Sequence, residues 1–256
     1  MIPQLFFSDG TFNNTGTFTD TNAFADLING NGTFNNSGTY NKQNNTLTTV
    51  SGGVDFNNTG IVNVNAGTLQ VASAFTNQGT INVAADAVFH GNNADFANVG
   101  TIQGNGTIQT LANNDLVNSG VIHPGDNSIG HLTLDGDLSQ TASGVINFEL
   151  ASLSNFDRMT VTDDVTLGGT IAVLNLGYVP VVGDSFVVAT FDERLDDSKF
   201  SLPVVSTEFG SGVKFEAIYH EHDVTLAVTA VPEPESWAML LAGLGLMGAV
   251  ARRRRI

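Results

Sequence analysis

A five-residue pattern recurs along the first half of the chain: a large apolar residue, any residue, Asn, any residue and Gly. It fits segments 12–16, 34–38, 56–60, 75–79, 96–100 and 116–120. The glycines of successive copies stand 22, 22, 19, 21 and 20 residues apart, and each is followed by a strand-like pair such as Thr-Phe or Thr-Ile. The glycine and its strand-like sequence return at 144–148 and 169–173. A period this constant indicates a repeat architecture.

The repeat predicts an all-β fold, a parallel β-solenoid (β-helix) with coils of about 20 residues. The unit is rich in Thr, Val, Ile and Asn-Gly turns and has no helical period. With 41% hydrophobic residues, the 256-residue chain can bury a continuous core, and 28 Gly with only 13% charged residues favours strands and turns over helices. We expect the solenoid to span residues 1–173, and the last strands with a C-terminal cap to span residues 174–230.

Stacking of coils predicts two ladders, because equivalent residues of neighbouring coils lie about 4.8 Å apart. An internal aromatic ladder would contain Phe12, Phe34, Phe56, Phe75 and Phe96, and an amide ladder at a corner would contain Asn14, Asn36, Asn58, Asn77, Asn98 and Asn118. The glycine of each copy is expected to adopt a positive φ at a tight corner. We interpret both ladders as structural rather than ligand-binding.

The charge distribution excludes several classes of partner for the body of the chain. The net charge is −16, and four of the nine basic residues are the arginines 252–255. The basic residues before residue 231 are Lys42, Arg158, Arg194, Lys199 and Lys214. So few cations cannot neutralise many phosphates, so no nucleic acid is expected as a partner. The absence of Cys excludes a disulfide scaffold and a thiolate metal site.

Two later segments, "NSGVIHPGDNSIGHLTLDGD" from residue 118 and "FDRMTVTDDVTLGGTIAV" from residue 156, carry a family resemblance. They resemble the C-terminal passenger region of autotransporter-type β-helix proteins. The matching residues are Pro124, Gly125, Ser128, Gly130, Leu132, Thr133, Asp157, Arg158, Val161, Thr162, Leu167, Gly169 and Thr170. The resemblance implies the β-helix fold and says little about activity. Where a membrane β-barrel would follow in an autotransporter, this sequence continues into a different ending.

That ending, residues 231–256, combines a Pro-Glu-Pro triplet, an apolar run and four arginines. Pro232, Glu233 and Pro234 predict an extended segment that a protease can bind. The run from Trp237 to Ala251 is short against the roughly 20 residues of a spanning helix, but interfacial anchors lengthen its reach. We therefore expect a short transmembrane-type helix with cytoplasmic arginines. Its predicted anchor residues are Trp237, Leu240, Leu241, Leu244, Leu246, Arg252, Arg253, Arg254 and Arg255.

With its three parts in this order, the tail resembles the PEP-CTERM sorting signal of Gram-negative bacteria. The resemblance implies an exosortase as partner, a membrane enzyme that cuts near the Pro-Glu-Pro motif, and transient anchoring in the inner membrane before transfer to the cell surface or extracellular matrix. The first residues, "MIPQLFFSDG", have no positive region and no long apolar run, so no signal peptide is visible. Because the first repeat begins at residue 12, we expect the export signal and N-terminal coils to be missing from this chain.

Candidate metal ligands are few. On a strand, His220 and His222 of the sequence His220-Glu221-His222 would point to one face, but a third ligand is not evident, so an exposed polar strand face is the preferred interpretation. The acidic pairs Asp163-Asp164, Asp192-Glu193 and Asp196-Asp197 are interpreted as solvated turns, because the calcium-binding nonapeptide repeat is absent. We expect no metal, no cofactor and no catalytic residue.

The sequence therefore predicts an exported structural or adhesin-like protein of the cell surface or matrix, with exopolysaccharide as a candidate partner. The alternative is a β-helix carbohydrate-active enzyme, a polysaccharide lyase or hydrolase. Such an enzyme needs clustered carboxylates, or a basic residue beside acidic metal ligands, on one coil face. The five scattered cations and uniform Asn/Thr/Gly coils do not form such a cluster, so we expect no enzyme.

Overall fold

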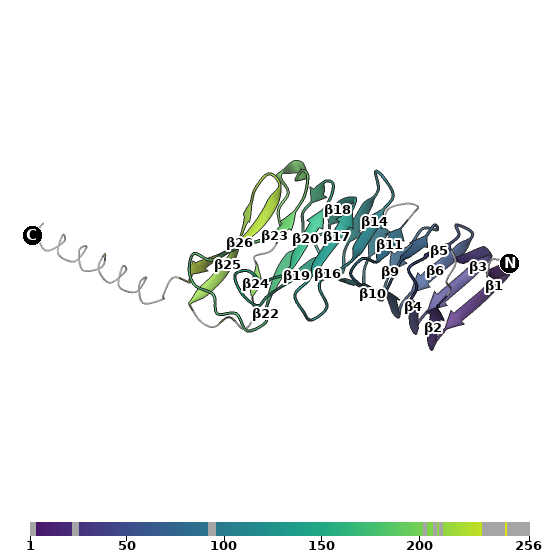
Figure 1. Cartoon of the computed structure of the whole chain (residues 1–256). Coiled ribbons are helices and arrows are strands. Elements are labelled where there is room, and N and C mark those ends of the chain that lie inside the picture. The colour runs from purple at the N-terminus through teal and green to yellow at the C-terminus, as the bar shows by residue number, and fades with distance from the viewer. Residues whose placement is uncertain are drawn as a thin grey trace, which may run out of the picture.

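The structure, a computed structural model, describes residues 4–21, 26–91, 96–201, 204–206, 209, 212–231 and 244. Within these residues the chain is an all-β, parallel solenoid of about seven turns, so the predicted fold of the body is confirmed. Figure 1 shows the coils stacked along one axis. The purple N-terminal coils lie at one end, and the hairpin of β25 (Val213–Tyr219) and β26 (Asp223–Ala230) lies at the other.

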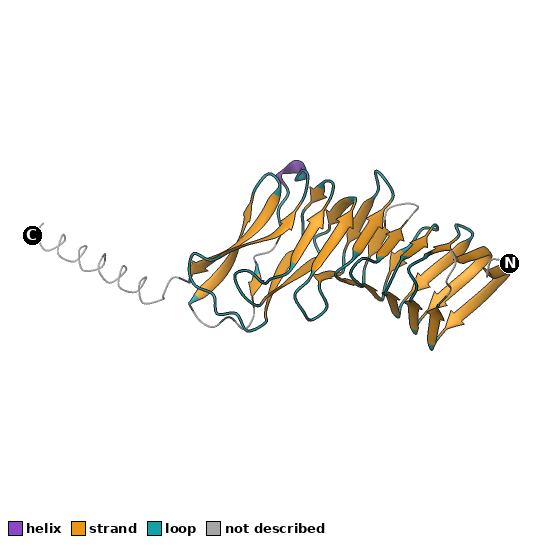
Figure 2. Ribbon diagram, viewed as in Figure 1, coloured by secondary structure: helices purple, strands orange, loops and turns teal. Residues whose placement is uncertain are grey.

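The described strands form two sheets, and each complete coil contributes to both. The larger sheet contains 17 strands: β1 (Gln4–Asn14), β3 (Asp26–Asn36), β5 (Leu47–Val50), β6 (Val54–Asn58), β8 (Thr68–Val71), β9 (Thr76–Asn77), β11 (Val88–Gly91), β12 (Phe96–Asn98), β14 (Thr107–Thr110), β15 (Asp115–Asn118), β17 (His131–Asp135), β18 (Asp137–Gln140), β20 (Arg158–Val161), β21 (Val165–Thr166), β23 (Ser185–Thr190), β25 and β26. The smaller sheet contains nine: β2 (Thr17–Asp20), β4 (Thr39–Lys42), β7 (Ile61–Val64), β10 (Thr80–Val83), β13 (Thr101–Gly104), β16 (Val121–Pro124), β19 (Val145–Leu150), β22 (Thr170–Asn175) and β24 (Val205–Ser206). Figure 2 shows strands along the whole described length; its purple element is the 3-10 helix η1 (Leu195–Asp197).

The register places each position of the repeat beside the same position of the next coil. β1 pairs with β3 in parallel, so that Phe12 lies opposite Phe34 and Asn14 opposite Asn36. The pairings of β10 with β7 and β13 follow the same rule. Strands such as β8, β10 and β14 bury their second and fourth residues, as the alternation of a strand requires. A regular repeat in the sequence thus becomes a column of identical side chains inside the solenoid.

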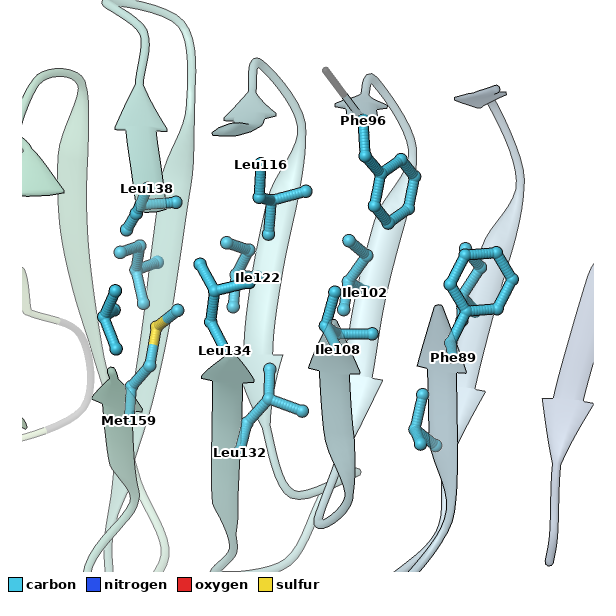
Figure 3. Close-up of a cluster of buried hydrophobic side chains, with 14 of the residues drawn as sticks. Phe89, Phe96, Ile102, Ile108, Leu116, Ile122, Leu132, Leu134, Leu138 and Met159 are labelled. Atoms are coloured by element: carbon cyan, nitrogen blue, oxygen red, sulfur yellow. The ribbon is translucent and has the colours of Figure 1, made fainter. Parts of the chain in front are cut away.

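The aromatic residues of the repeat stack inside the solenoid. Successive ring centroids lie 5.0, 5.4, 5.7 and 5.3 Å apart from Phe12 through Phe34, Phe56 and Phe75 to Phe96. In the next coil Leu116 takes the position of the phenylalanine, opposite Phe96. Figure 3 shows that the column continues with Leu116 and Leu138, and that other buried aliphatic side chains such as Ile102, Ile108 and Leu134 pack beside it. Burial of this column contributes about 25 cal/mol for each Å² of apolar surface.

The asparagines of the repeat form a second column at the end of each strand, where the chain turns. Nδ2 of each donates to Oδ1 of the next, with distances of 2.6, 2.8, 2.9, 2.9 and 2.7 Å along Asn14, Asn36, Asn58, Asn77, Asn98 and Asn118. Asn118 continues the column by donating to Oε1 of Gln140 at 2.8 Å. The amides also donate to backbone carbonyls, as Asn36 does to Ile61 at 2.9 Å. The column therefore satisfies buried polar groups at one corner of every coil.

The repeat glycines correct one expectation. We expected a positive φ at the fifth position, but Gly38, Gly60, Gly79, Gly100 and Gly120 are not among the positive-φ residues. They are required instead by close stacking, because a Cβ atom at any of the five would lie between 2.0 and 2.2 Å from the carbonyl oxygen of the glycine one coil earlier. The repeat in the sequence shows that glycine is needed at this position. Only the structure shows that the cause is contact with the neighbouring coil rather than backbone conformation.

This explanation predicts that Gly79→Ala destabilises the solenoid and that Gly16→Ala does not. The added Cβ at position 79 would lie 2.1 Å from the carbonyl oxygen of Gly60, whereas at Gly16, in the first described coil, nothing lies within 4 Å. Overpacking of this kind costs about 1–3 kcal/mol. Urea unfolding of the two variants, followed by circular dichroism, measures the difference. Equal unfolding midpoints would show that coil contact does not select the glycine.

The C-terminal end of the described solenoid is covered by antiparallel strands. On one side β23 pairs in parallel with β20 of the preceding coil, and on its other side it pairs antiparallel with β26. β26 pairs antiparallel with β25, and Phe186 and Phe215 of these strands lie inside with a centroid distance of 6.4 Å. The change to antiparallel pairing ends the row of parallel strands and covers the last apolar layer.

Candidate functional site

The predicted sorting and anchor residues lie outside the described residues, apart from Leu244, whose side chain is 53% exposed. These residues are Pro232, Glu233, Pro234, Trp237, Leu240, Leu241, Leu246, Arg252, Arg253, Arg254 and Arg255. The predicted transmembrane-type helix therefore stays a prediction. Among the residues that the structure describes, no helix has the length and apolar character needed to cross a membrane.

The His220-Glu221-His222 segment does not lie on a strand, so that expectation is wrong. It occupies the turn between β25 and β26, where the alternation of a strand does not apply. Nδ1 of His220 lies 2.7 Å from Oδ1 of Asp223, and Nδ1 of His222 contacts the backbone oxygen of Asp192. Each imidazole thus has a separate partner, and the two do not converge.

A different cluster of ionisable side chains forms near the ends of β16 and β19, beside the loops 125–130 and 151–156. His123, Glu149 and Asp157 have ligand atoms that all lie within 4.8 Å of one another. Among the described residues they are the one group of three or more His, Asp or Glu side chains this close together. All three residues are buried: His123 is 8% exposed, Glu149 3% and Asp157 0%. The predicted acidic pairs at 163–164, 192–193 and 196–197 belong to no such group.

Asp157 holds a loop and a strand together. Its Oδ1 accepts a hydrogen bond from the backbone N–H of Gly130 at 2.7 Å, and its Oδ2 accepts one from the backbone N–H of Glu149 at 2.8 Å. Gly130 ends the loop that begins with Gly125, whose φ is +80°. The carboxylate therefore connects this loop to the end of β19 and has a fixed orientation.

His123 and Glu149 lie near the ends of the neighbouring strands β16 and β19. The inward side chains of these strands, such as Ile122 and Phe148, alternate with outward ones, so both His123 and Glu149 occupy outward positions. Both are nevertheless buried, which places them under the adjoining loops rather than in solvent. Nε2 of His123 lies 3.7 Å from Oε1 of Glu149.

Removal from water changes the proton affinity of all three groups. Burial raises the pKa of Asp157 to about 7; the hydrogen bonds from the backbone of Glu149 and Gly130 oppose this change, and the charge of Glu149 adds to it. Burial also raises the pKa of Glu149, and the charge of Asp126 raises it further. Burial lowers the pKa of His123, against the attraction of Asp126. The cluster thus has an imidazole that favours its neutral form beside two carboxyl groups with little access to water.

A cleft of about 500 Å³ lies next to this cluster, where β14, β17 and β20 begin. Gly130 and Phe156 line the cleft. The backbone N–H of Gly130 donates to Asp157, and Phe156 directly precedes Asp157 in the chain. The polar lining of the cleft includes His131 and Arg158, and the Arg158 guanidinium lies 4.4 Å above the ring of Phe156. The cleft can therefore offer hydrogen-bond donors to a polar ligand.

Sequence reasoning missed the buried cluster. His123 and Asp157 lie in the two segments that carry the autotransporter resemblance, and Glu149 lies between them, but the three are separated by 26 and 8 residues. Alternation along β19 places Glu149 on the outer face, which predicts exposure. One signal could have indicated the cluster. A histidine and a glutamate occupy outward positions near the ends of two neighbouring strands, and a loop follows each strand.

Comparison with known proteins bears on the tail of the chain. The sequence matches no curated protein. Residues 230–255 match the family described as the PEP-CTERM protein-sorting motif. The resemblance of the tail is therefore confirmed, whereas the autotransporter resemblance stays a prediction. Such a motif implies an exported protein that exosortase, a membrane enzyme, recognises during transient membrane anchoring. By this match, residues 230–255 of the solenoid protein are a PEP-CTERM protein-sorting motif.

Proposed function

We propose that the protein is a structural, adhesin-like component of the cell surface or biofilm matrix of a Gram-negative bacterium. The observation that carries the proposal is a sorting motif at the end of an elongated, repetitive solenoid. A stiff stack of coils holds its surface residues at regular spacing away from an anchor point, which suits a spacer or an adhesive surface.

Exopolysaccharide is the partner that we propose for the body. The chain carries a net charge of −16, so a neutral polymer suits it better than an anionic one. Exposed amides run along the coils: Asn35 donates to Asn13, and Asn57 donates to Asn35, both at 2.9 Å. Rows of amide and hydroxyl groups provide donors and acceptors for sugar hydroxyls, and the cleft beside Arg158 provides a further site of this kind.

We propose a non-catalytic role for the same surface. A glycoside hydrolase places two carboxyl groups on opposite sides of the scissile bond. Among the described residues that line the cleft, Asp86 is the one carboxylate. The buried pair Glu149 and Asp157 lies beneath the loops, where a polysaccharide chain has no room. These observations favour binding over cleavage.

Sorting is expected to depend on Pro232-Glu233-Pro234. The test expresses the chain behind a secretory signal peptide in a Gram-negative host that has exosortase. Wild-type protein should be recovered outside the cell without its C-terminal arginines, whereas the variant with all three residues replaced by Ala should remain uncut in the inner membrane. The triplet, which its two prolines are expected to keep extended, precedes an apolar run of marginal length, which fits an intermediate that awaits cleavage.

Mass spectrometry of the secreted protein measures this outcome. A variant with Arg252–Arg255 replaced by Ser is the control, because it should alter membrane orientation while leaving the triplet intact. Recovery of the intact sequence 252–256 on the mature surface protein would contradict cleavage and leave a permanent C-terminal anchor.

A further inference from the structure

The buried cluster beside the cleft has the composition of a metal site. We propose that His123, Glu149 and Asp157 bind a divalent transition-metal ion, with Zn²⁺ the best match, and that the ion fastens the loops 125–130 and 151–156 to the solenoid. This departs from the expectation of no metal, and it is independent of the proposed sorting function.

The geometry is close to that of a zinc site. Zinc lies about 2.0–2.2 Å from nitrogen and oxygen ligands, so ligand atoms of a tetrahedral site are about 3.3 Å apart. Nε2 of His123 and Oε1 of Glu149 are 3.7 Å apart, and no ligand atom of the cluster is more than 4.8 Å from the others. Metal binding would draw the ligand atoms together by up to about 1.5 Å, and the fourth position is left for water.

Two atoms of the cluster require a partner. Nε2 of His123 and Oε2 of Glu149 are buried and have no hydrogen-bond partner among the described residues. Buried polar atoms without partners are rare because the lost hydration is not replaced. The ion-pair partner of Glu149 in the described part of the chain is His123, and no Lys or Arg pairs with it there. A divalent cation would bind the orphan nitrogen of His123 and the carboxylate of Glu149, and it would offset the charge of the two carboxylates.

Asp157 supplies the orientation that a metal ligand needs. Each of its oxygens accepts one backbone N–H, from Gly130 or Glu149, and keeps a lone pair for a metal. Hydrogen bonds of this kind fix a ligating carboxylate and tune its affinity. The same residue binds the end of the first loop, while the second loop lies directly before it in the chain. Metal binding would therefore hold both loops at one point.

The ligand types select the class of metal. Ca²⁺ and Mg²⁺ take oxygen ligands, whereas an imidazole with two carboxylates suits Zn²⁺ or a neighbouring transition metal. The adjacent cleft is lined by Gly130, whose backbone N–H binds Asp157, and by Phe156, which precedes Asp157 in the chain. The exposed His220 and His222 can bind zinc adventitiously, so the experiment removes them.

The test uses the full chain carrying His220→Ala and His222→Ala. After chelator treatment and dialysis against micromolar zinc, elemental analysis should find about one zinc per chain. Zinc at about 100 times its Kd should raise the thermal midpoint by about 5 °C or more, since binding to the folded state alone stabilises it. In this background His123→Gln should reduce zinc affinity at least about 100-fold. The control is His131→Gln, which removes the exposed imidazole at the start of β17 and should leave zinc affinity unchanged.

Several outcomes would overturn the proposal: no bound zinc in the double variant, unchanged affinity in His123→Gln, or displacement of zinc by an equal concentration of calcium. Circular dichroism checks that His123→Gln is folded. If this variant does not fold, X-ray absorption of the zinc-loaded double variant decides, because it should show one imidazole and otherwise oxygen ligands. A spectrum with no imidazole, or with two or more, would place the metal elsewhere.

Discussion

Phe56→Ala is expected to lower the free energy of unfolding by about 3–5 kcal/mol, the usual cost of deleting a buried aromatic side chain. Phe56 is 1% exposed and lies in the middle of the aromatic column. Its ring centroid is 5.4 Å from that of Phe34, 5.9 Å from that of Tyr40 and 5.7 Å from that of Phe75. Backbone pairing holds the coils at a fixed spacing, so the neighbours cannot close the cavity.

The control for this variant is Phe6→Ala, which removes the same ring from a position that is 66% exposed. Its expected cost is within about 0.5 kcal/mol. Urea unfolding followed by far-ultraviolet circular dichroism compares both variants with the wild type. If Phe56→Ala and Phe6→Ala unfold at the same urea concentration, the register of the solenoid is wrong.

Asn77→Asp is the second change with a large expected effect, about 3–5 kcal/mol near pH 7, although it changes no volume. Nδ2 of Asn77 donates to Oδ1 of Asn98 at 2.9 Å and to the backbone oxygens of Gly79 and Thr101 at 3.0 and 3.1 Å. In the aspartate variant a carboxylate oxygen would face these three acceptors at a position that is 0% exposed. The column loses a donor and gains a buried charge.

The sign of the pH dependence identifies this mechanism. Burial and the facing oxygens would raise the pKa of the new carboxyl in the folded state above its unfolded value of about 3.9. The folded state then binds the proton more tightly, so the stability of the variant relative to wild type falls as pH rises from about 4 through the folded pKa. Lowering the pH toward 4 should recover part of the loss, because a protonated carboxyl can donate to Asn98.

The matched control is Asn57→Asp in the exposed amide row, where Nδ2 donates to Oδ1 of Asn35 at 2.9 Å. Water solvates the new charge there, so the expected cost is within about 0.5 kcal/mol with little dependence on pH. Unfolding midpoints of both variants at pH 4.5 and pH 7 test the comparison. A flat pH profile for Asn77→Asp would mean that the carboxylate reaches solvent and that the column is not sealed.

Much of the fold follows from periodicity. The spacing of 22 residues between Phe12 and Phe34 equals the length of one coil, and the β1–β3 pairing puts these two residues opposite one another. Asn14 and Asn36 share that spacing and donate along the axis. A repeated strand pattern permits one register in which every apolar residue is inside, so the repeat predicts the neighbours of each residue. The Gln140 extension of the amide column was not predicted because Gln replaces Asn there and breaks the pattern.

The sequence by itself determined the coil length, the residues of the two columns and the sorting tail, because each is encoded in local order or in a fixed period. The tertiary structure decided what no period encodes. It showed that Gly79 is glycine because a carbonyl of the preceding coil lies against it, and that His220 and His222 lie in a turn. It also brought His123, Glu149 and Asp157 together, since their burial depends on how two irregular loops cover the ends of β16 and β19. Loop conformation of this kind is decided by contacts between distant segments, which a one-dimensional pattern does not contain.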